Sequence, residues 1–264
     1  MGLVQHLPFI EQEPHGVYIM HEKFERFIDW HSHSKGQLSY CEGGIAYIEV
    51  EGKTYVVPSH YFFWVPVGVK HVLRVSQSAT NIRSIYFGLE DFDTNPFLSS
   101  LGIYPASELI IQMIKYTEKW KGEMVLPGDE RYTFMRALLQ VMIPQQENTV
   151  PIILPITQND RLQKILDYLK LHIESPLTLK QVSDKFGTSE RTLSRLFQAE
   201  LKLSFLQYLK NMRIIKSIEL LQNTHLSLSE IAEKVGYSTL GAFSNTFFEL
   251  TKMRPSDMRK NFFM

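Results

Sequence analysis

The protein has 264 residues, 44% of them apolar, and its 28 Lys and Arg residues balance 28 Asp and Glu residues. This composition excludes a disordered or collagen-like chain, and the length suits two globular domains. The longest apolar run, residues 61–69, is shorter than the roughly 20 residues that cross a bilayer. The first residues lack a secretion signal and the one cysteine, Cys41, excludes an internal disulfide, so we expect a cytoplasmic protein with no membrane partner.

The first part of the chain reads as short strands in which apolar and polar residues alternate. The clearest hairpin spans residues 45–57, where Glu51-Gly52 supplies the turn because glycine reaches positive φ readily. Further strands are predicted at residues 61–65, 71–75 and 82–87. The pattern therefore predicts a β domain over residues 1–100.

Histidines in this β domain are spaced so that they can meet on one face. His31 and His33 are two apart on a predicted strand, and His71 can arrive from a neighbouring strand. Three imidazoles that converge in a barrel suit Zn, Ni, Cu or Fe. Gln37 follows His33 by four residues and adds a polar side chain.

These residues resemble the two sequence motifs of cupins, which are small β-barrels. The first motif is His-x-His, then a polar residue four positions on and a glycine, and the second is Pro-x-Gly-x-x-His; here they are carried by His31, His33, Gln37, Gly44, Pro66, Gly68 and His71. The resemblance implies a cupin-like barrel with His31, His33, Gln37 and His71 as its effector or metal site. Metal-binding cupins usually carry Glu where Gln37 stands. Three interpretations stay open: a divalent metal ion on His31, His33 and His71, a pocket for an organic effector, or histidines that only satisfy internal hydrogen bonds.

Helical periodicity replaces the strand pattern after residue 100. Two amphipathic segments are predicted, at residues 107–120 and 129–143. A stretch with three prolines, residues 144–160, is the best candidate for a linker. We therefore expect a helical connector and linker over residues 101–157, before an all-helical part, residues 158–264.

The two parts of the chain carry opposite net charge. Residues 1–157 hold 12 Lys and Arg against 17 Asp and Glu, whereas residues 158–264 hold 16 against 11. The basic second part indicates a nucleic-acid partner, although an excess of five charges also suits an ordinary solvated surface.

The basic part contains a repeat at a spacing of about 50 residues. Residues 178–187, TLKQVSDKFG, return as residues 227–236, SLSEIAEKVG. Each copy opens with a capping box and closes at a glycine suited to a tight turn; the capping pairs are Thr178 with Gln181 and Ser227 with Glu230. A second amphipathic helix follows each turn, at residues 189–201 and 238–250. Both copies are thus predicted helix-turn-helix motifs.

A long predicted helix, residues 204–222, joins the two copies. Its 19 residues span about 28 Å at ~1.5 Å per residue, which approaches the ~34 Å between successive major grooves of B-DNA. One chain can therefore place two recognition helices on one side of a duplex.

Residues 158–264 resemble the double helix-turn-helix domain of the AraC/XylS family of bacterial transcription regulators. The second copy carries the family signature from Ile231 through Phe247 to Pro255. The resemblance implies a sequence-specific, effector-sensing regulator that is not an enzyme. The implied partners are a double-stranded DNA operator, a small-molecule or metal effector and a second copy of the chain through the connector helices, with RNA polymerase as a further candidate.

The polar face of each recognition helix supplies the candidate DNA contacts. In the first helix these are Arg191, Thr192, Ser194, Arg195 and Gln198, and in the second they are Ser244 and Asn245. The second helix has no basic residue, so we expect the first copy to contribute more of the affinity, although Asn can pair with adenine. Lys202 and Lys252 stand where the family usually has glycine and are expected to store about 1 kcal/mol each if left-handed.

Two other functions remain as alternatives. A cupin barrel can be a metal oxygenase or isomerase, but the carboxylate ligand is absent and no catalytic acid–base pair stands out. The barrel can also be purely structural, in a constitutive DNA-binding protein.

Overall fold

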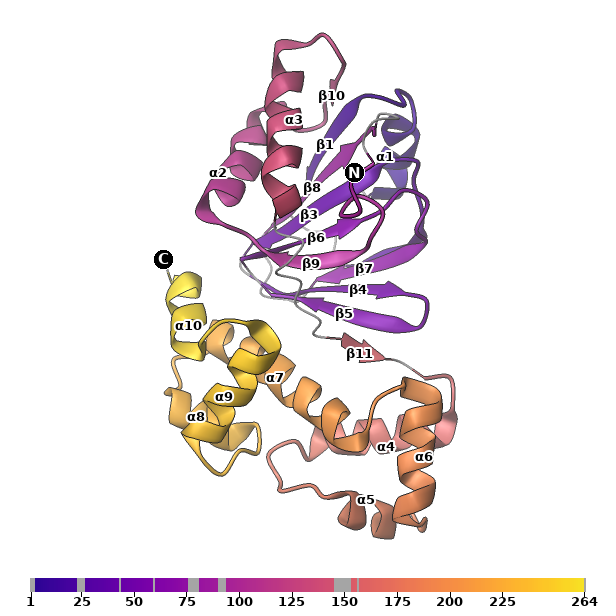
Figure 1. Cartoon of the computed structure of the whole chain (residues 1–264), viewed down its shortest axis with the longest axis vertical. Helices are drawn as coiled ribbons and strands as arrows, with labels where there is room; N and C mark the ends of the chain where they lie inside the picture. The colour runs from indigo at the N-terminus through magenta and orange to yellow at the C-terminus, as the bar shows by residue number, and fades with distance from the viewer. Residues whose placement is uncertain are drawn as a thin grey trace. The chain divides into compact units, whose positions relative to one another are not determined.

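The computed structural model describes residues 3–22, 27–42, 44–58, 60–75, 81–89, 94–144, 153–155 and 157–263. Most of the predicted linker, residues 145–152 and 156, lies outside the described residues. The chain divides into two compact units, residues 1–51 with 57–151 and residues 52–56 with 152–264. The predicted α+β architecture, with a cupin-like β region before a helical C-terminal region, is confirmed (Figure 1).

The strands form two sheets in which every described pairing is antiparallel. The six-stranded sheet has the order β10 (Met124–Val125), β1 (Val17–Glu22), β8 (Asn81–Phe87), β3 (Gly36–Glu42), β6 (Tyr61–Val65), β9 (Gly102–Pro105). The five-stranded sheet has the order β11 (Ile153–Pro155), β5 (Lys53–Val57), β4 (Ala46–Val50), β7 (His71–Val75), β2 (Phe27–His31). A helix, α1 (Leu3–Ile10), precedes β1.

The predicted hairpin is present as β4 and β5. Its turn residues Glu51 and Gly52 have φ of 49° and 74°. Two successive positive φ values match the right-handed twist of the flanking strands, which is why glycine stands at the second position. The strands predicted at residues 61–65, 71–75 and 82–87 are also confirmed, as β6, β7 and β8.

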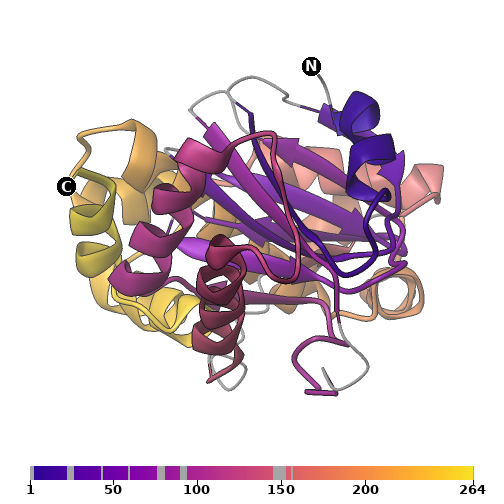
Figure 2. The same ribbon diagram turned by 90° about the horizontal axis from the view of Figure 1, so that it is seen from above.

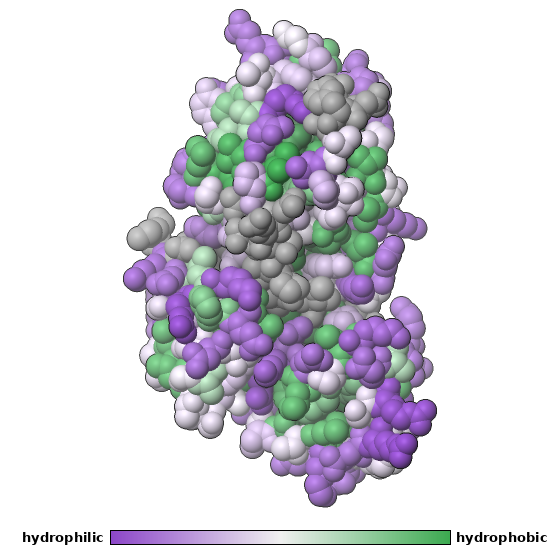
Figure 3. Space-filling model, viewed as in Figure 1, coloured by the Kyte–Doolittle hydropathy of each residue, from purple (hydrophilic) through white to green (hydrophobic). Residues whose placement is uncertain are grey.

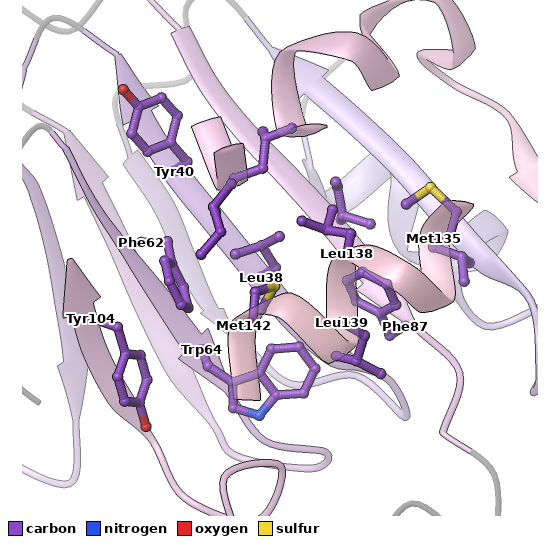
Figure 4. Packing of buried hydrophobic residues seen from close by; sticks show 14 of the residues in the cluster. Leu38, Tyr40, Phe62, Trp64, Phe87, Tyr104, Met135, Leu138, Leu139 and Met142 are labelled. Atoms are coloured by element: carbon purple, nitrogen blue, oxygen red, sulfur yellow. The ribbon is translucent and has the colours of Figure 1, made fainter. Parts of the chain in front are cut away.

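The connector helices cover the six-stranded sheet and belong to the same unit. They are α2 (Glu108–Tyr116), continued by the 3₁₀ turn η1 (Thr117–Trp120), and α3 (Glu130–Met142). Ser107 and Asp129 cap α2 and α3 through their side chains, as expected of residues that satisfy free N–H groups. The apolar sides of both helices pack on the sheet (Figures 1, 2 and 4); the buried residues involved include Ile110, Ile114, Met135, Leu138, Leu38, Phe62, Trp64 and Phe87. The unit extends past residue 100 because β9, β10 and these helices complete and cover its sheet.

The C-terminal unit consists mainly of seven described helices. They are α4 (Asp160–Leu171), α5 (Leu179–Lys185), α6 (Glu190–Leu201), α7 (Phe205–Asn223), α8 (Leu228–Lys234), α9 (Leu240–Thr251) and α10 (Pro255–Phe263). Both predicted capping boxes are present, at α5 and α8, and Ser204 with Gln207 forms a third at α7. Gly187 and Gly236 close the tight turns at φ of 59° and 79°. Both predicted helix-turn-helix motifs are confirmed, with the long α7 between them. No helix in the described ranges has the length and apolar character needed to cross a membrane.

A buried histidine links the sheet to η1. His21 on β1 lies 2.8 Å from the Thr117 hydroxyl, and that hydroxyl donates to the Ile114 carbonyl at 2.7 Å. The Thr117 oxygen therefore accepts from Nε2–H of His21, which leaves Nδ1 without a proton. Burial lowers the pKa of His21 to about 4, with the Arg83 and Lys121 charges acting in the same direction and Glu118 opposing them.

We expect the N-terminal unit to lose stability as the pH falls from 6.5 to 4. The unfolded chain binds a proton at His21 below pH 6.5, whereas the folded chain does so only near pH 4. This difference lowers the free energy of unfolding by on the order of 3 kcal/mol over that pH range. All three tryptophans, Trp30, Trp64 and Trp120, lie in this unit, so tryptophan fluorescence during urea unfolding reports it selectively. His21→Gln, which can still donate to Thr117, is expected to reduce the loss. The same change at the exposed His172 is the control, and an unchanged pH dependence in His21→Gln would contradict the assignment.

Candidate sensor site and nucleic-acid interface

Three histidines converge on the barrel side of the five-stranded sheet. His31 is the last residue of β2 and faces His71, the first residue of β7, in the strand register. His33 was predicted on a strand, but it lies in the loop between β2 and β3, because β2 ends at His31 and β3 begins only at Gly36. All three are buried, and their ligand-capable nitrogens lie within 4.8 Å of one another. The structure thus brings the predicted residues together.

Each of these imidazoles is oriented by a backbone carbonyl. The Nδ1 atoms of His31, His33 and His71 lie 2.7, 2.6 and 2.8 Å from the carbonyl oxygens of Asp29, Lys35 and Val69. A carbonyl oxygen only accepts hydrogen bonds, so each Nδ1 carries the proton and each Nε2 keeps its lone pair. A histidine that donates from one nitrogen to a carbonyl presents the other as a well-oriented metal ligand.

The carboxamide of Gln37 lies between two of the histidines. Its Oε1 is 2.9 Å from Nε2 of His33 and 3.0 Å from Nε2 of His71. Its Nε2 donates to Ser39 at 2.8 Å, and Ser39 lies 2.6 Å from Ser84 across the sheet. In this orientation an amide oxygen faces two nitrogen lone pairs, an arrangement that is favourable around a cation.

Burial also keeps the cluster neutral. Desolvation lowers the pKa of His31 and of His33, and it lowers that of His71 to about 3, with the His31 and His33 charges adding to the effect. At neutral pH the three histidines are therefore uncharged, and a cation at this site would have to come from outside the protein. Nε2 of His31 has no hydrogen-bond partner among the described residues, although it is buried. A buried polar atom without a partner needs an explanation such as an ion.

The donor set indicates the kind of ion that fits. It contains three neutral imidazoles and one amide, and the cluster found among the described residues includes no carboxylate. Imidazole suits Zn, Cu, Fe and Ni, whereas Mg and Ca prefer carboxylates and other oxygen ligands. The residues present therefore fit a first-row transition metal.

Lys35 supports this site and was not singled out from the sequence. Its side chain is fully buried, and its ammonium donates to the Gly16 carbonyl at 2.6 Å and to the Glu13 carbonyl. Burial lowers the pKa of Lys35 to about 8. The lysine thus fixes the backbone whose carbonyl orients His33. Its position two residues after His33 could have indicated a role at the site, but a lysine between two strands is usually a surface residue.

The two predicted recognition helices each bury one side and expose the other. In α6, Leu193, Phe197 and Leu201 are buried, and in α9 the matching residues are Phe243, Phe247 and Thr251. The five candidates on α6, namely Arg191, Thr192, Ser194, Arg195 and Gln198, are all exposed. On α9, Asn245 is exposed and Ser244 is half-buried. Figure 3 shows hydrophilic side chains over α6 at the lower right.

A hollow of 490 Å³ lies beside α6. Its lining combines candidate DNA contacts with residues of α4 and the α5–α6 turn; the residues are Asn159, Arg161, Ile165, Thr188, Thr192, Leu193, Arg195, Leu196 and Ala199. Arg161 was not predicted from the sequence, because only the neighbouring helix brings it near Arg195. The two guanidinium groups give this side of α6 a positive charge.

Both recognition helices end at a left-handed lysine. Lys202 and Lys252 have φ of 55° and 57° at the C-caps of α6 and α9. The condition for the expected strain is therefore met, since a side chain in this region is unfavourable by about 1 kcal/mol or more. The ammonium of Lys202 donates a hydrogen bond to the Ala199 carbonyl at 2.8 Å, which offsets part of this unfavourable backbone energy.

Comparisons with known proteins agree with this architecture. Residues 16–152 match the AraC-like ligand binding domain, and residues 182–261 match a helix-turn-helix domain. The chain belongs to the AraC family. This AraC-family protein is 28% identical over 225 residues to the HTH-type transcriptional regulator YfiF of Bacillus subtilis, covering 79% of this chain and 71% of the relative. It is 26% identical over 221 residues to NimR of Escherichia coli, another HTH-type transcriptional regulator, covering 82% and 77%.

A solved structure is also similar to part of this chain. It is the C-terminal domain of AraT, a response regulator from Geobacillus stearothermophilus, at 34% identity over 39% of this chain and 86% of that one, with a TM-score of 0.38.

Lys252→Gly is expected to raise the free energy of unfolding by up to about 1 kcal/mol. Glycine removes the left-handed strain, and its greater freedom in the unfolded chain offsets part of the gain. Urea unfolding of the C-terminal unit followed by circular dichroism measures this. The control is Lys210→Gly inside α7, where glycine is expected to lower stability by about 1 kcal/mol. A loss of stability in Lys252→Gly would show that the lysine is not strained.

Proposed function

We propose that this AraC-family protein is a cytoplasmic regulator whose barrel senses a divalent transition metal and whose two helix-turn-helix motifs bind an operator. The observation that carries the metal assignment is the orientation of His31, His33 and His71. Each donates from Nδ1 to a carbonyl and presents an unprotonated Nε2 to the others. Family membership supports a ligand-binding role for this domain.

The bound ion would attract the lone pairs of the three Nε2 atoms and of the Gln37 oxygen, which face one another without a positive charge between them. The histidines would hold it, and Gln37 would connect the site to Ser39 and Ser84 through the hydrogen bonds of its amide. Regulation then follows from linkage: the ion shifts the population of DNA-binding forms by its difference in affinity for them. An organic effector in the same site is the second candidate, supported by the match of residues 16–152 to the AraC-like ligand binding domain.

The connector helices support self-association as part of this function. Leu109 and Tyr116 on α2 are 58% and 52% exposed, and Tyr116 contacts Trp120 and Phe134. We propose that a homodimer forms through this side of α2 and that RNA polymerase is a further partner. No catalytic residue is assigned, in keeping with relatives that are named transcriptional regulators.

About one metal ion per chain is expected in untagged protein after soaking in Zn²⁺, Ni²⁺, Cu²⁺ or Fe²⁺ and washing. Elemental mass spectrometry measures the content, and His31→Ala/His71→Ala is expected to lose it. The exposed pair His172→Ala/His225→Ala is the matched control. Protein that keeps no metal, or a double variant that keeps as much as the wild type, would exclude the histidine cluster as a metal site.

Arg195→Ala is expected to lose sequence discrimination, by about 1–3 kcal/mol at the base pair concerned if Arg195 pairs with a guanine.

Lys202→Ala is expected to weaken all duplexes alike and to flatten the salt dependence by about one unit, because a phosphate contact carries no sequence information. Fluorescence anisotropy with selected and scrambled duplexes at several salt concentrations separates the two effects. Unchanged binding of Arg195→Ala would place α6 outside the groove.

A further inference from the structure

The two helix-turn-helix motifs can be compared residue by residue in the structure. The buried residues Leu193, Phe197 and Leu201 of α6 return 50 positions later in α9, and so does the left-handed lysine. The turn before α9 holds one residue more, so the offset is 50 after the turn and 49 before it. The exposed Arg191, Arg195 and Gln198 thus correspond to Gly241, Asn245 and Phe248. The second motif has lost both arginines of the first.

Continuing the comparison leads to Arg254. It corresponds to Ser204, which caps α7 and forms a capping box with Gln207. Arg254 occupies the same place before α10, where its carbonyl accepts from the N–H groups of Asp257 and Met258. An arginine side chain cannot accept a hydrogen bond, so it cannot cap the helix as serine does. The second motif therefore gives up a stabilising cap, and a local rule broken in this way points to a functional position.

The Arg254 side chain packs back against the exposed side of α9. Its guanidinium lies over the ring of Phe248, with 4.7 Å between the guanidinium carbon and the ring centroid, and Nη1 donates to Oδ1 of Asn245 over 3.5 Å. Phe248 is 43% exposed, so its ring face is open to the guanidinium. Stacking on an aromatic ring fixes the plane of a guanidinium and leaves its other N–H groups free to donate.

We infer that Arg254, held by Phe248 and Asn245, is the DNA-contacting cation of the second helix-turn-helix motif and binds a backbone phosphate of the operator. The inference rests on the proposed operator binding. It places a positive charge beside Asn245, at the position where the first motif carries Arg195, although the charge comes from outside the recognition helix. It also supplies a cation to the second motif, whose recognition helix has no basic residue of its own.

Arg254→Ser tests this directly, because it restores the residue type of the first motif. A structural role for Arg254 predicts that the variant melts at a lower temperature, whereas our inference predicts melting at or above the wild-type temperature, since serine can cap α10. DNA affinity is expected to fall on the order of tenfold, equally for selected and scrambled duplexes, with a salt slope flatter by about one unit. Arg254→Lys keeps the charge and is expected to keep the slope while losing part of the affinity.

The probe is a duplex selected from a random library by the full-length wild-type chain. Lys260→Ser is the matched control, because it removes one positive charge from α10, the helix that follows Arg254, where Nζ of Lys260 lies 3.9 Å from Oδ1 of Asp257. Wild-type affinity and salt slope in Arg254→Ser, or a loss as large in Lys260→Ser, would overturn the inference while leaving operator binding intact. A wild-type chain that enriches no duplex would instead overturn the proposed function.

Discussion

The six-stranded sheet must be buried on both faces, and the N-terminal unit depends on this constraint. Strand β3 shows it best: Leu38 and Tyr40 pack under α2 and α3, while Gln37 and Ser39 point into the barrel. Without the helices, the apolar side of the sheet would face water. The rigid apolar packing on one side (Figure 4) therefore fixes the backbone that positions Gln37 against His33 and His71 on the other.

The barrel side of the sheet is held together by hydrogen bonds between buried polar groups, whereas the helix side is held together by apolar packing. Buried polar groups are stable only when they are hydrogen-bonded, and backbone carbonyls satisfy one nitrogen of each histidine. The other nitrogens then converge on one another, and two of them face the Gln37 oxygen. The same hydrogen bonds that make the imidazoles tolerable in the interior thus leave a cluster of unprotonated nitrogens that suits a cation.

The C-terminal unit is built differently, from local signals that repeat. Side-chain caps start α5, α6, α8 and α9, and tight turns at Gly187 and Gly236 join the helices of each motif. The exceptions to these local rules lie directly after the recognition helices: left-handed lysines follow both, and Arg254 stands where the first motif has a capping serine. Departures from local stability at these positions are consistent with residues that serve a partner rather than the fold.

The sequence by itself determined the features that depend on neighbouring residues: the Glu51-Gly52 hairpin, the capping boxes, the helix periodicity and hence the two helix-turn-helix motifs. Local turn chemistry and side-chain spacing suffice for these. The tertiary structure alone decided which nitrogen of each histidine is protonated, because the carbonyls of Asp29, Lys35 and Val69 must be in place. It also decided the short strands β9 and β10, which are stable only through distant partners and therefore leave no local pattern. The contact of Arg254 with α9 likewise depends on how the chain turns after that helix, which no residue spacing predicts.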